Sequence, residues 1–325
     1  MSRSLVTGGA GFVGKSLVKA LKATGRDVVV LDLVEAKETY SVVGSIMNPE
    51  TVRKAFDGVS EVFHLAGNAQ LWAKDEDAIS IVNIEGTRNV VRESLEKGVA
   101  KFVYCSSLTT LVSSAAPIGA SSVDEGVVLT SDELIGAYPK SKRLGEIIVE
   151  EAVVNGLNAS VALPTEPLGP GDEAMTPPTQ MIVDFLNGKT PASINCLLNF
   201  VPVGSLAEGF VAIADKGKRG ERYLLGGENV PMAKLLANLE IISGRKMPTL
   251  QLPYGVALLA GFVDTGIASL TGKLPKAPLT GVRLAGRRVT FSSAKAESEL
   301  GWQASPFLPA LEEAVAWMRE NELLN

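Results

Sequence analysis

The sequence predicts an α/β fold, a doubly wound parallel sheet with helices on both faces, from two periodic patterns. Short apolar, β-branched runs recur through the first half, at residues 4–7, 27–33, 61–66, 100–105 and 159–163. Helical spacing fills most of the intervals, where for example Leu17, Val18 and Leu21 share one helix face. Strands that are apolar on both sides and separated by helices are typical of a parallel sheet covered on both faces.

The second half begins with a change of pattern at Leu163. The segment LPTEPLGPGDEAMTPPT holds five prolines and two glycines and predicts a loop that leaves the carboxyl edge of the sheet. We expect a first domain of residues 1–164 plus about 200–224, and a smaller C-terminal α/β cap of residues 165–199 and 225–325. Further elements are expected as helices near 180–186, 232–243 and 310–321, and as strands near 200–203 and 222–225.

The composition limits the class of partner and compartment. Of the 325 residues 46% are hydrophobic, the net charge is −5, and no long basic run is present, so we expect no nucleic-acid partner. Two cysteines, Cys105 and Cys196, and one histidine predict neither a disulfide framework nor a metal site. With the first strand starting near Ser4, we expect no signal peptide and a cytoplasmic location.

One apolar stretch, residues 254–270, raises the question of a membrane. A span needs about 20 mostly apolar residues, whereas Asp264 and three glycines interrupt this stretch. We interpret it as a helix packed in the domain rather than a transmembrane span. The alternative is an interfacial patch that contacts a membrane and collects an apolar substrate.

The segment TGGAGFVG directly follows the first predicted strand and opens a helix. Its glycines Gly8, Gly11 and Gly14 have the spacing G-x-x-G-x-x-G. Such a loop turns tightly and lets backbone N–H groups approach a pyrophosphate at the helix N-terminus. The order strand, loop, helix therefore predicts a bound dinucleotide.

An acidic residue follows the loop at the end of the second predicted strand. Asp32 stands 24 positions after Gly8 (32 − 8). A carboxylate there accepts hydrogen bonds from both ribose hydroxyls and repels a 2′-phosphate, which favours NAD over NADP. Two alternatives stay open: Asp32 caps the loop after its strand, or the neighbouring Arg26 and Lys37 accommodate NADP.

The segment GAYPKSK places Tyr138 and Lys142 four residues apart, on one face of a predicted helix. An ammonium beside a phenol favours phenolate, so we expect the pKa of Tyr138 to be lowered and its hydroxyl to exchange a proton with a carbinol or carbonyl oxygen. Lys142 would also bond the nicotinamide ribose. A hydroxyl at the tip of the preceding strand would polarise the same oxygen: Ser107 is our choice, with Ser106 and Thr109 as alternatives.

These motifs together resemble a known superfamily. TGGAGFVG, VFHLAG, NIEGTRNVV, KFVYCSS, YPKSK and LGPGD, in this order, are similar to the extended short-chain dehydrogenase/reductases. LWAKD, IVDFLNGK, YLLGGEN, LTGKLP and FSSAKAESELGW resemble the branch of hopanoid-associated sugar epimerases, near dihydroflavonol reductases and 3β-hydroxysteroid dehydrogenases. The resemblance spans nearly the whole chain and implies a Rossmann fold with Ser107, Tyr138 and Lys142 as catalytic triad. It also implies cofactor contacts at Phe12, Val13, Ala66, Gly67, Asn83 and Pro164, with Asn83 supporting the catalytic helix.

The sequence departs from this family pattern in two places. Many relatives carry G-D-[IL] after the third strand, where this chain has Gly44-Ser45-Ile46. Many sugar-nucleotide members carry Arg-Pro after the sixth strand, where this chain has Leu163-Pro164 followed by Thr165-Glu166. We interpret Glu166 either as a substrate-binding acid or as a solvated loop residue.

Three other side chains have a structural and a functional interpretation. Trp72 either walls the substrate pocket or packs under the cap, and Thr109 is a further candidate substrate contact. His64, the single histidine, is expected to be a buried, hydrogen-bonded strand residue rather than a catalytic group, because the Tyr138–Lys142 pair already supplies proton transfer.

The function expected from these features is an NAD(P)-dependent oxidoreductase that interconverts a secondary alcohol and a ketone on a small or lipid-like substrate. The alternative is a sugar-nucleotide epimerase or dehydratase with transient oxidation by bound NAD. A diphosphate pocket needs basic residues, and the cap is poor in them, with Lys189 and Arg245 as candidates. A binding module without chemistry would not need the triad.

A homodimer is expected from a second apolar face on the catalytic helix. Leu144, Ile147 and Ile148 lie on this face. In the relatives that the sequence resembles, the helix pairs with its own copy and with the helix around Val90. Burial within one chain would explain the same residues.

Overall fold

The computed structural model describes residues 2–37, 39–116, 118–119 and 122–325. Its centre is a seven-stranded sheet of order β11-β7-β5-β4-β1-β2-β3, in which every neighbouring pair is parallel. The strands are β1 (Arg3–Thr7), β2 (Asp27–Asp32), β3 (Tyr40–Val43), β4 (Glu61–His64), β5 (Lys101–Cys105), β7 (Ala159–Pro164) and β11 (Arg222–Leu225). The chain winds outward from β1 in both directions, so the predicted fold class is confirmed.

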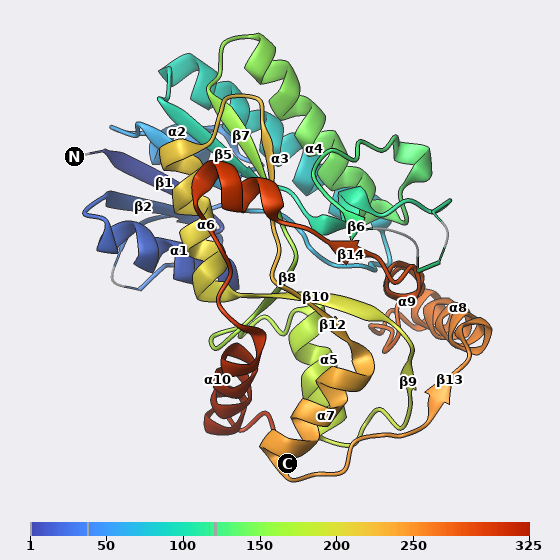
Figure 1. Cartoon of the computed structure of the whole chain (residues 1–325). Helices are drawn as coiled ribbons and strands as arrows, with labels where there is room; N and C mark the ends of the chain where they lie inside the picture. The colour runs from blue at the N-terminus through green and yellow to red at the C-terminus, as the bar shows by residue number, and fades with distance from the viewer. Residues whose placement is uncertain (1, 38, 117, 120–121) are drawn as a thin grey trace.

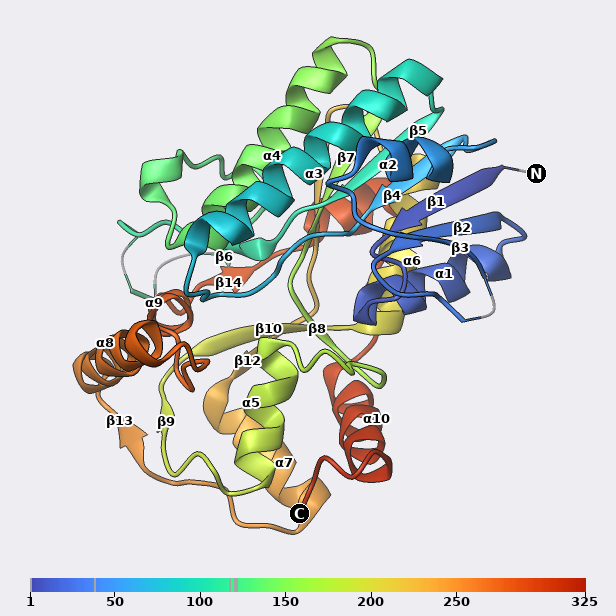
Figure 2. The same ribbon diagram turned by 180° about the vertical axis from the view of Figure 1, so that it is seen from behind.

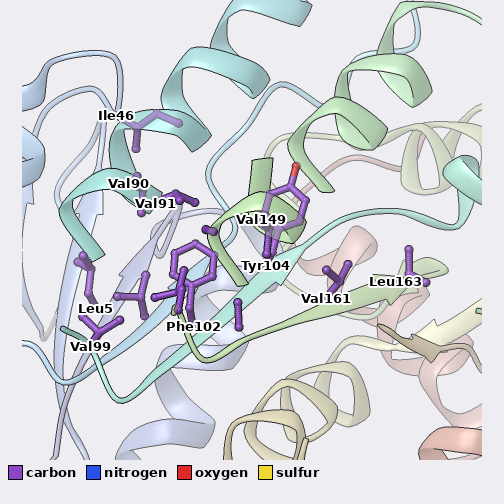
Figure 3. Packing of buried hydrophobic residues seen from close by; sticks show 14 of the residues in the cluster. Leu5, Ile46, Val90, Val91, Val99, Phe102, Tyr104, Val149, Val161 and Leu163 are labelled. Atoms are coloured by element: carbon purple, nitrogen blue, oxygen red, sulfur yellow. The ribbon is translucent and has the colours of Figure 1, made fainter. Parts of the chain in front are cut away.

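Helices cover both faces of this sheet (Figures 1 and 2). On one face lie α1 (Phe12–Ala23) and α6 (Val203–Lys216), and on the other lie α2 (Pro49–Ala55), α3 (Glu76–Lys97) and α4 (Ala137–Val154). Successive strand residues supply the two cores: Leu5 packs with Val90 and Val149 under α3 and α4, whereas Val6 packs with Leu17 and Phe210 under α1 and α6. Figure 3 shows the first of these cores.

The sequence patterns do not give the bounds of β3 or of α2. Strand β3 lies at the edge of the sheet, where Tyr40 is 58% and Val43 57% exposed. A short edge strand with solvent on its sides needs no continuous apolar run, so hydrophobic patterning does not mark it.

A second layer forms around a three-stranded sheet of order β12-β10-β8. Its strands are β8 (Glu166–Leu168), β10 (Leu197–Pro202) and β12 (Glu228–Pro231), packed with α5 (Pro177–Leu186), α7 (Met232–Ser243) and α10 (Phe307–Glu320). The chain returns to the main sheet through α6 and β11 before entering this layer again. The domain boundaries themselves stay a prediction.

The segment predicted to be a loop after Leu163 contains structure. Pro164 still belongs to β7, and Glu166–Leu168 forms β8, which pairs in parallel with β10. Prolines are tolerated in strands where the missing N–H faces no partner. The prediction of an uninterrupted loop is therefore wrong.

Short pairs and turns complete the chain. Two-stranded pairs join β6 (Ser122–Val123) to β14 (Thr290–Phe291) and β9 (Ser193–Ile194) to β13 (Gln251–Leu252). Single turns of helix occur at Leu108–Leu111, Ser131–Glu133 and Ala296–Leu300.

The apolar stretch forms α8 (Tyr254–Thr271), which lies with α9 (Leu279–Gly286) at the periphery (Figures 1 and 2). Only Ala257, Gly261 and Ala268 of α8 are buried. The prediction of a helix packed in the domain is therefore wrong, because small residues face the protein while the large apolar ones face outward. By length and composition alone α8 could cross a membrane, with 17% of its residues buried.

Candidate active site

The glycine loop follows β1 and places helix α1 against the sheet. Gly8 has φ +74°, and a Cβ there would lie 2.7 Å from the amide nitrogen of Ala66. A Cβ on Gly14 would lie 2.1 Å from the carbonyl oxygen of Gly8, so this glycine packs against the loop itself. A Cβ on Gly11, by contrast, would have only the carbonyl oxygen of Gly8 within 4 Å, at 3.4 Å.

The first turn of α1 fits an anionic ligand. Its N-cap is Gly11, no side chain caps it, and its first turn contains no acidic residue. The leading N–H groups of a helix have no intrahelical acceptor, and they point along the positive end of the helix dipole. Phe12 and Val13 begin this helix, as a pyrophosphate site requires.

Asp32 ends β2 beside this loop. One carboxylate oxygen accepts a hydrogen bond from Ala10 N at 2.9 Å and the other from Leu33 N at 2.7 Å. The capping interpretation is thus correct, yet a carboxylate has about four acceptor positions and keeps room for ribose hydroxyls. Asp32 therefore holds the loop and can also bind the cofactor.

The two basic residues considered for NADP lie in different places. Arg26 precedes β2 at its amino end and binds Glu61 and Asp215, so it lies at the opposite end of the strand from Asp32. Its proposed contact with a 2′-phosphate is wrong for this reason. Lys37 is exposed in the connection between β2 and β3.

The segment after β4 joins the glycine loop to the catalytic helix. Ala66 N donates to Thr7 Oγ1 at 3.2 Å, and a Cβ on Gly67 would lie 2.7 Å from Asn83 Oδ1 and 3.9 Å from Lys142 Nζ. The ends of β1 and β4 and the first turns of α4 are thus in direct contact.

Asn83 on α3 is buried and fully hydrogen-bonded. Its amide accepts from Asn68 N at 2.7 Å and donates to Asn68 O and Ser141 Oγ, both at 2.9 Å. Ser141 in turn donates to the carbonyl of Tyr138 at 2.8 Å. Asn83 therefore lies where the predicted support of the catalytic helix requires it.

Ser107, which follows β5, lies close enough to the Tyr138 side chain to favour its phenolate. Ser107 Oγ accepts from Thr109 N at 3.2 Å and from Thr109 Oγ1 at 3.0 Å. A hydroxyl has two acceptor positions and one proton, so Ser107 still has its proton to donate to a further acceptor. Of the alternatives, Ser106 donates instead to Glu146, away from Tyr138.

The pKa of Tyr138 is raised to about 12, because burial disfavours the phenolate more than the neighbouring Ser107 favours it. The prediction of a lowered pKa is therefore wrong. Burial also lowers the pKa of Lys142, whose Nζ lies 4.8 Å from the ring centroid of Tyr104. At neutral pH Tyr138 is consequently a proton donor.

A buried carboxylate that the sequence interpretation missed holds this region together. Glu146 is fully buried one turn beyond Lys142 and accepts hydrogen bonds from Ser106 and, at 2.9 Å, from Thr110. Arg143 and Arg222 both lie 3.1 Å from its Oε2. The signal was the i, i+4 spacing from Lys142, which places both residues on one helix face.

His64 is a structural residue, as predicted. The buried ring forms a hydrogen bond with the hydroxyl of Thr7 at 2.7 Å and another with the hydroxyl of Thr87 at 3.0 Å. Desolvation and the nearby Lys142 lower its pKa to about 3, so the ring is neutral. A neutral ring that bridges β1 and α3 positions these elements and transfers no proton at physiological pH.

Glu166 on β8 is not a solvated loop residue. Its Oε2 is buried without a hydrogen-bond partner, and burial raises the pKa of the carboxyl to about 8. Trp72, also buried, is 8% exposed. Whether either touches substrate stays a prediction, as does the cofactor contact of Pro164.

Metal-binding and disulfide chemistry have no assembled site within the described ranges. Cys105 and Cys196 are free, and no three His, Cys, Asp or Glu residues there gather as metal ligands.

The fold and the site define a dinucleotide-dependent α/β enzyme. The chain belongs to the NAD dependent epimerase/dehydratase family, which matches residues 4–226. It is 32% identical to a putative dihydroflavonol 4-reductase of Synechocystis sp., over 97% of this chain and 94% of that one. It is 29% identical to sterol demethylase protein B of Methylococcus capsulatus, over 99% of each. The crystal structure of gox2253 superposes with a TM-score of 0.84 at 32% identity, covering 100% of both chains.

These similarities fix the class of the protein. It is an oxidoreductase of the extended short-chain dehydrogenase/reductase type, and NAD is the cofactor of its family. The glycine loop, the uncapped N-terminus of α1 and Asp32 have the chemistry that this cofactor requires.

Proposed function

We propose that the protein reduces a ketone on a lipid-like substrate to a secondary alcohol, and catalyses the reverse reaction at higher pH. The observation that carries this proposal is the placement of Ser107 beside the Tyr138 side chain, with Lys142 one turn along α4. The segment after β4 connects this group of residues to the glycine loop, because Gly67 approaches Lys142 and Ala66 approaches Gly8.

The site residues divide the chemistry among them. Ser107 binds the substrate oxygen and keeps it beside Tyr138, and Tyr138 donates its proton to that oxygen as the carbonyl is reduced. Lys142, one turn along α4, stabilises the phenolate that remains. The bound dinucleotide supplies hydride transfer to and from carbon.

We assign NAD rather than NADP as the preferred cofactor. Asp32 places a negative charge beside the ribose position, which disfavours a 2′-phosphate. Of Arg26 and Lys37, only Lys37 follows β2 at the end where Asp32 lies. Its exposed ammonium is screened by solvent.

A lipid-like substrate is supported by the relatives and by Glu166. The relative from Methylococcus capsulatus is named for sterol demethylation, and the Synechocystis relative for reduction of a dihydroflavonol. Leu163 stands where many sugar-nucleotide enzymes carry arginine, and Glu166 follows three residues later. A carboxyl with a raised pKa donates a hydrogen bond to a neutral substrate but offers no positive charge to a diphosphate.

The second candidate function is epimerisation of a sugar nucleotide, favoured by the family name. Of the cap's two candidate cations, Arg245 donates to the carbonyl of Leu186 at 2.8 Å, and Lys189 lies 4.0 Å from Asp184. Both are thus already engaged, which weighs against a diphosphate pocket built on them.

One experiment separates the two functions. The purified protein is incubated with NADH or NADPH and a panel of ketones, including steroid-like ones, and separately with NAD⁺ and UDP-sugars. Stoichiometric loss of reduced-cofactor absorbance with a ketone supports the oxidoreductase. Formation of a sugar epimer without net change in cofactor would contradict it and establish the epimerase.

Assembly and location are further parts of this proposal. The outer face of α3 and α4 carries a groove of about 300 Å³ lined in part by Ile84, Lys140 and Leu144. Leu144 is 36% and Ile81 49% exposed there, which supports a homodimer across these helices. The two free cysteines of the chain, Cys105 and Cys196, are consistent with a reducing, cytoplasmic compartment.

A further inference from the structure

Helix α8 presents its apolar side chains to solvent. Its large apolar residues recur at spacings of three and four and are all about half exposed or more: Val256, Leu259, Val263, Ile267 and Leu270. Leu274, just beyond the helix, is exposed as well. The opposite side holds the small buried residues Ala257, Gly261 and Ala268. This arrangement inverts the usual amphipathic helix, whose apolar stripe faces the core.

The polar groups of α8 are used inward, toward α9. Asp264 Oδ2 accepts a hydrogen bond from Ala277 N at 2.8 Å, and Thr265 Oγ1 accepts one from Leu279 N at 3.0 Å. The outward orientation of the apolar face is therefore fixed by specific bonds and is not a consequence of a loosely attached helix.

The charge of this hairpin is opposite to that of the rest of the chain. Residues 253–288 contain five cations (Lys273, Lys276, Arg283, Arg287, Arg288) and one anion (Asp264), a balance of +4. Because the whole chain carries −5, the remainder carries −9 (−5 − 4). Lys273, Lys276 and Arg283 are exposed. An apolar helix face bordered by cations complements a surface that is apolar below and anionic above, which is the structure of an anionic bilayer.

The hairpin also lies against the segment that leads to Tyr138. A Cβ on Gly136, the residue that caps α4, would lie 2.7 Å from Thr280 Cγ2 of α9. On the next residue of α9, a Cβ at Gly281 would lie 3.4 Å from Leu71 Cδ1, in the segment after β4. A surface bound by α8 and α9 therefore adjoins the rim of the proposed active site.

We propose that the α8–α9 hairpin docks the protein on an anionic lipid bilayer, with the outward face of α8 inserted among the headgroups. Delivery of a lipid-dissolved ketone to Tyr138 by this route rests on the proposed function, whereas the docking does not. A second copy of the chain on this face is the main competing occupant, but two faces that each carry cations repel one another.

The test is vesicle flotation of the full-length protein. We expect flotation with phosphatidylcholine vesicles containing about one-third phosphatidylglycerol, little with phosphatidylcholine alone, and release at about 0.5 M salt, where screening shortens the range of surface charge to a few ångströms. The double variant L259S/I267S and the double variant K273E/K276E should each lower the vesicle partition coefficient at least about tenfold.

Matched controls change equivalent residues elsewhere. The pair V154S/I241S removes apolar side chains that are 85% and 80% exposed, and the pair K19E/K54E reverses two exposed charges on α1 and α2. Both should float as the parent does. Equal flotation of the α8 variants and the controls would overturn the proposal, and so would the absence of flotation with anionic vesicles.

Other outcomes identify a different occupant. Flotation that survives alkaline carbonate indicates a spanning helix, and an α8 variant that turns a dimer into a monomer without any vesicle binding indicates a second copy; either result overturns the proposal. Binding of NADH and turnover of a water-soluble ketone are measured on the same variants and should not change. Flotation without turnover of any ketone would contradict the proposed function alone.

Discussion

Gly14 of α1 lies so close to Gly8 that a Cβ on Gly14 would be 2.1 Å from the carbonyl oxygen of Gly8. Since backbone atoms on both sides define this contact, neither side can move aside cheaply. The turn that presents the free N–H groups of α1 therefore depends on glycine at this position.

Gly14→Ala is accordingly expected to displace the loop, lower the free energy of unfolding by at least about 3 kcal/mol, and abolish dinucleotide binding. The matched control is Gly204→Ala on α6, where a Cβ meets nothing within 4 Å and φ is not positive. Urea unfolding and quenching of tryptophan fluorescence by NADH measure the two effects. Equal stability and equal NADH affinity for both variants would contradict the assigned role of the loop.

Asp32→Ala is expected to weaken NAD binding by about tenfold to a hundredfold, because a charge-assisted hydrogen bond contributes about 1.5–3 kcal/mol. NADP binding should change less or improve, since the carboxylate no longer repels the 2′-phosphate. Asp27→Ala, at the opposite end of β2 in an ion pair with Arg3, serves as control. Calorimetric titration with both cofactors measures the change, and an unaltered NAD affinity would refute the preference.

Glu166→Gln is expected to change how stability depends on pH. The folded protein holds this carboxyl proton up to about pH 8, whereas an ordinary glutamate releases it near 4.5. The stability contributed by Glu166 is thus complete below pH 4.5 and is lost as the pH rises toward 8, with a slope of up to about 1.4 kcal/mol per pH unit.

The measurement is urea unfolding of parent and variant at pH 6 and pH 8. The variant should lose less stability than the parent over this interval, and the exposed Glu312→Gln on α10 should behave as the parent does. A variant and a parent with parallel pH profiles would show that the Glu166 carboxyl is ionised in the folded protein.

The sequence predicts the sheet well because its central strands are buried on both faces. The apolar runs at 27–33 and 100–105 agree with β2 and β5 to within one residue at each end. The spacing of Tyr138 and Lys142 likewise fixes their shared helix face, since local periodicity alone determines it. Where only neighbours along the chain matter, the patterns suffice.

The errors arise where distant residues decide the outcome. The pKa of Tyr138 depends on what surrounds the phenol, and the burial of Glu166 depends on its pairing in register with Phe200 of β10. Hydropathy predicts that α8 is an apolar helix, but it does not say whether the apolar face of α8 is buried or exposed to solvent. The predicted contact of Arg26 with a 2′-phosphate could have been excluded from the sequence, because Arg26 and Asp32 lie at opposite ends of one predicted strand.

Glu146 shows a further limit of motif reading. Its four partners come from the residue after β5, the turn that follows it, α4 and β11. The i, i+4 spacing from Lys142 therefore points to Glu146 itself but not to the cluster around it. The cluster is nonetheless what joins Ser106, and with it Ser107, to the helix that carries Tyr138.

The central claim, that Tyr138 supplies the proton for hydride transfer, is tested most directly by single-turnover reduction of a ketone substrate with bound NADH in Tyr138→Phe. Loss of a general acid typically slows the chemical step about a hundredfold to ten-thousandfold. We expect the single-turnover rate of the variant to fall by this factor. NADH affinity should stay within about twofold of the parent, because the phenyl ring of the variant retains the packing contacts of the Tyr138 ring. A single-turnover rate equal to that of the parent would contradict it.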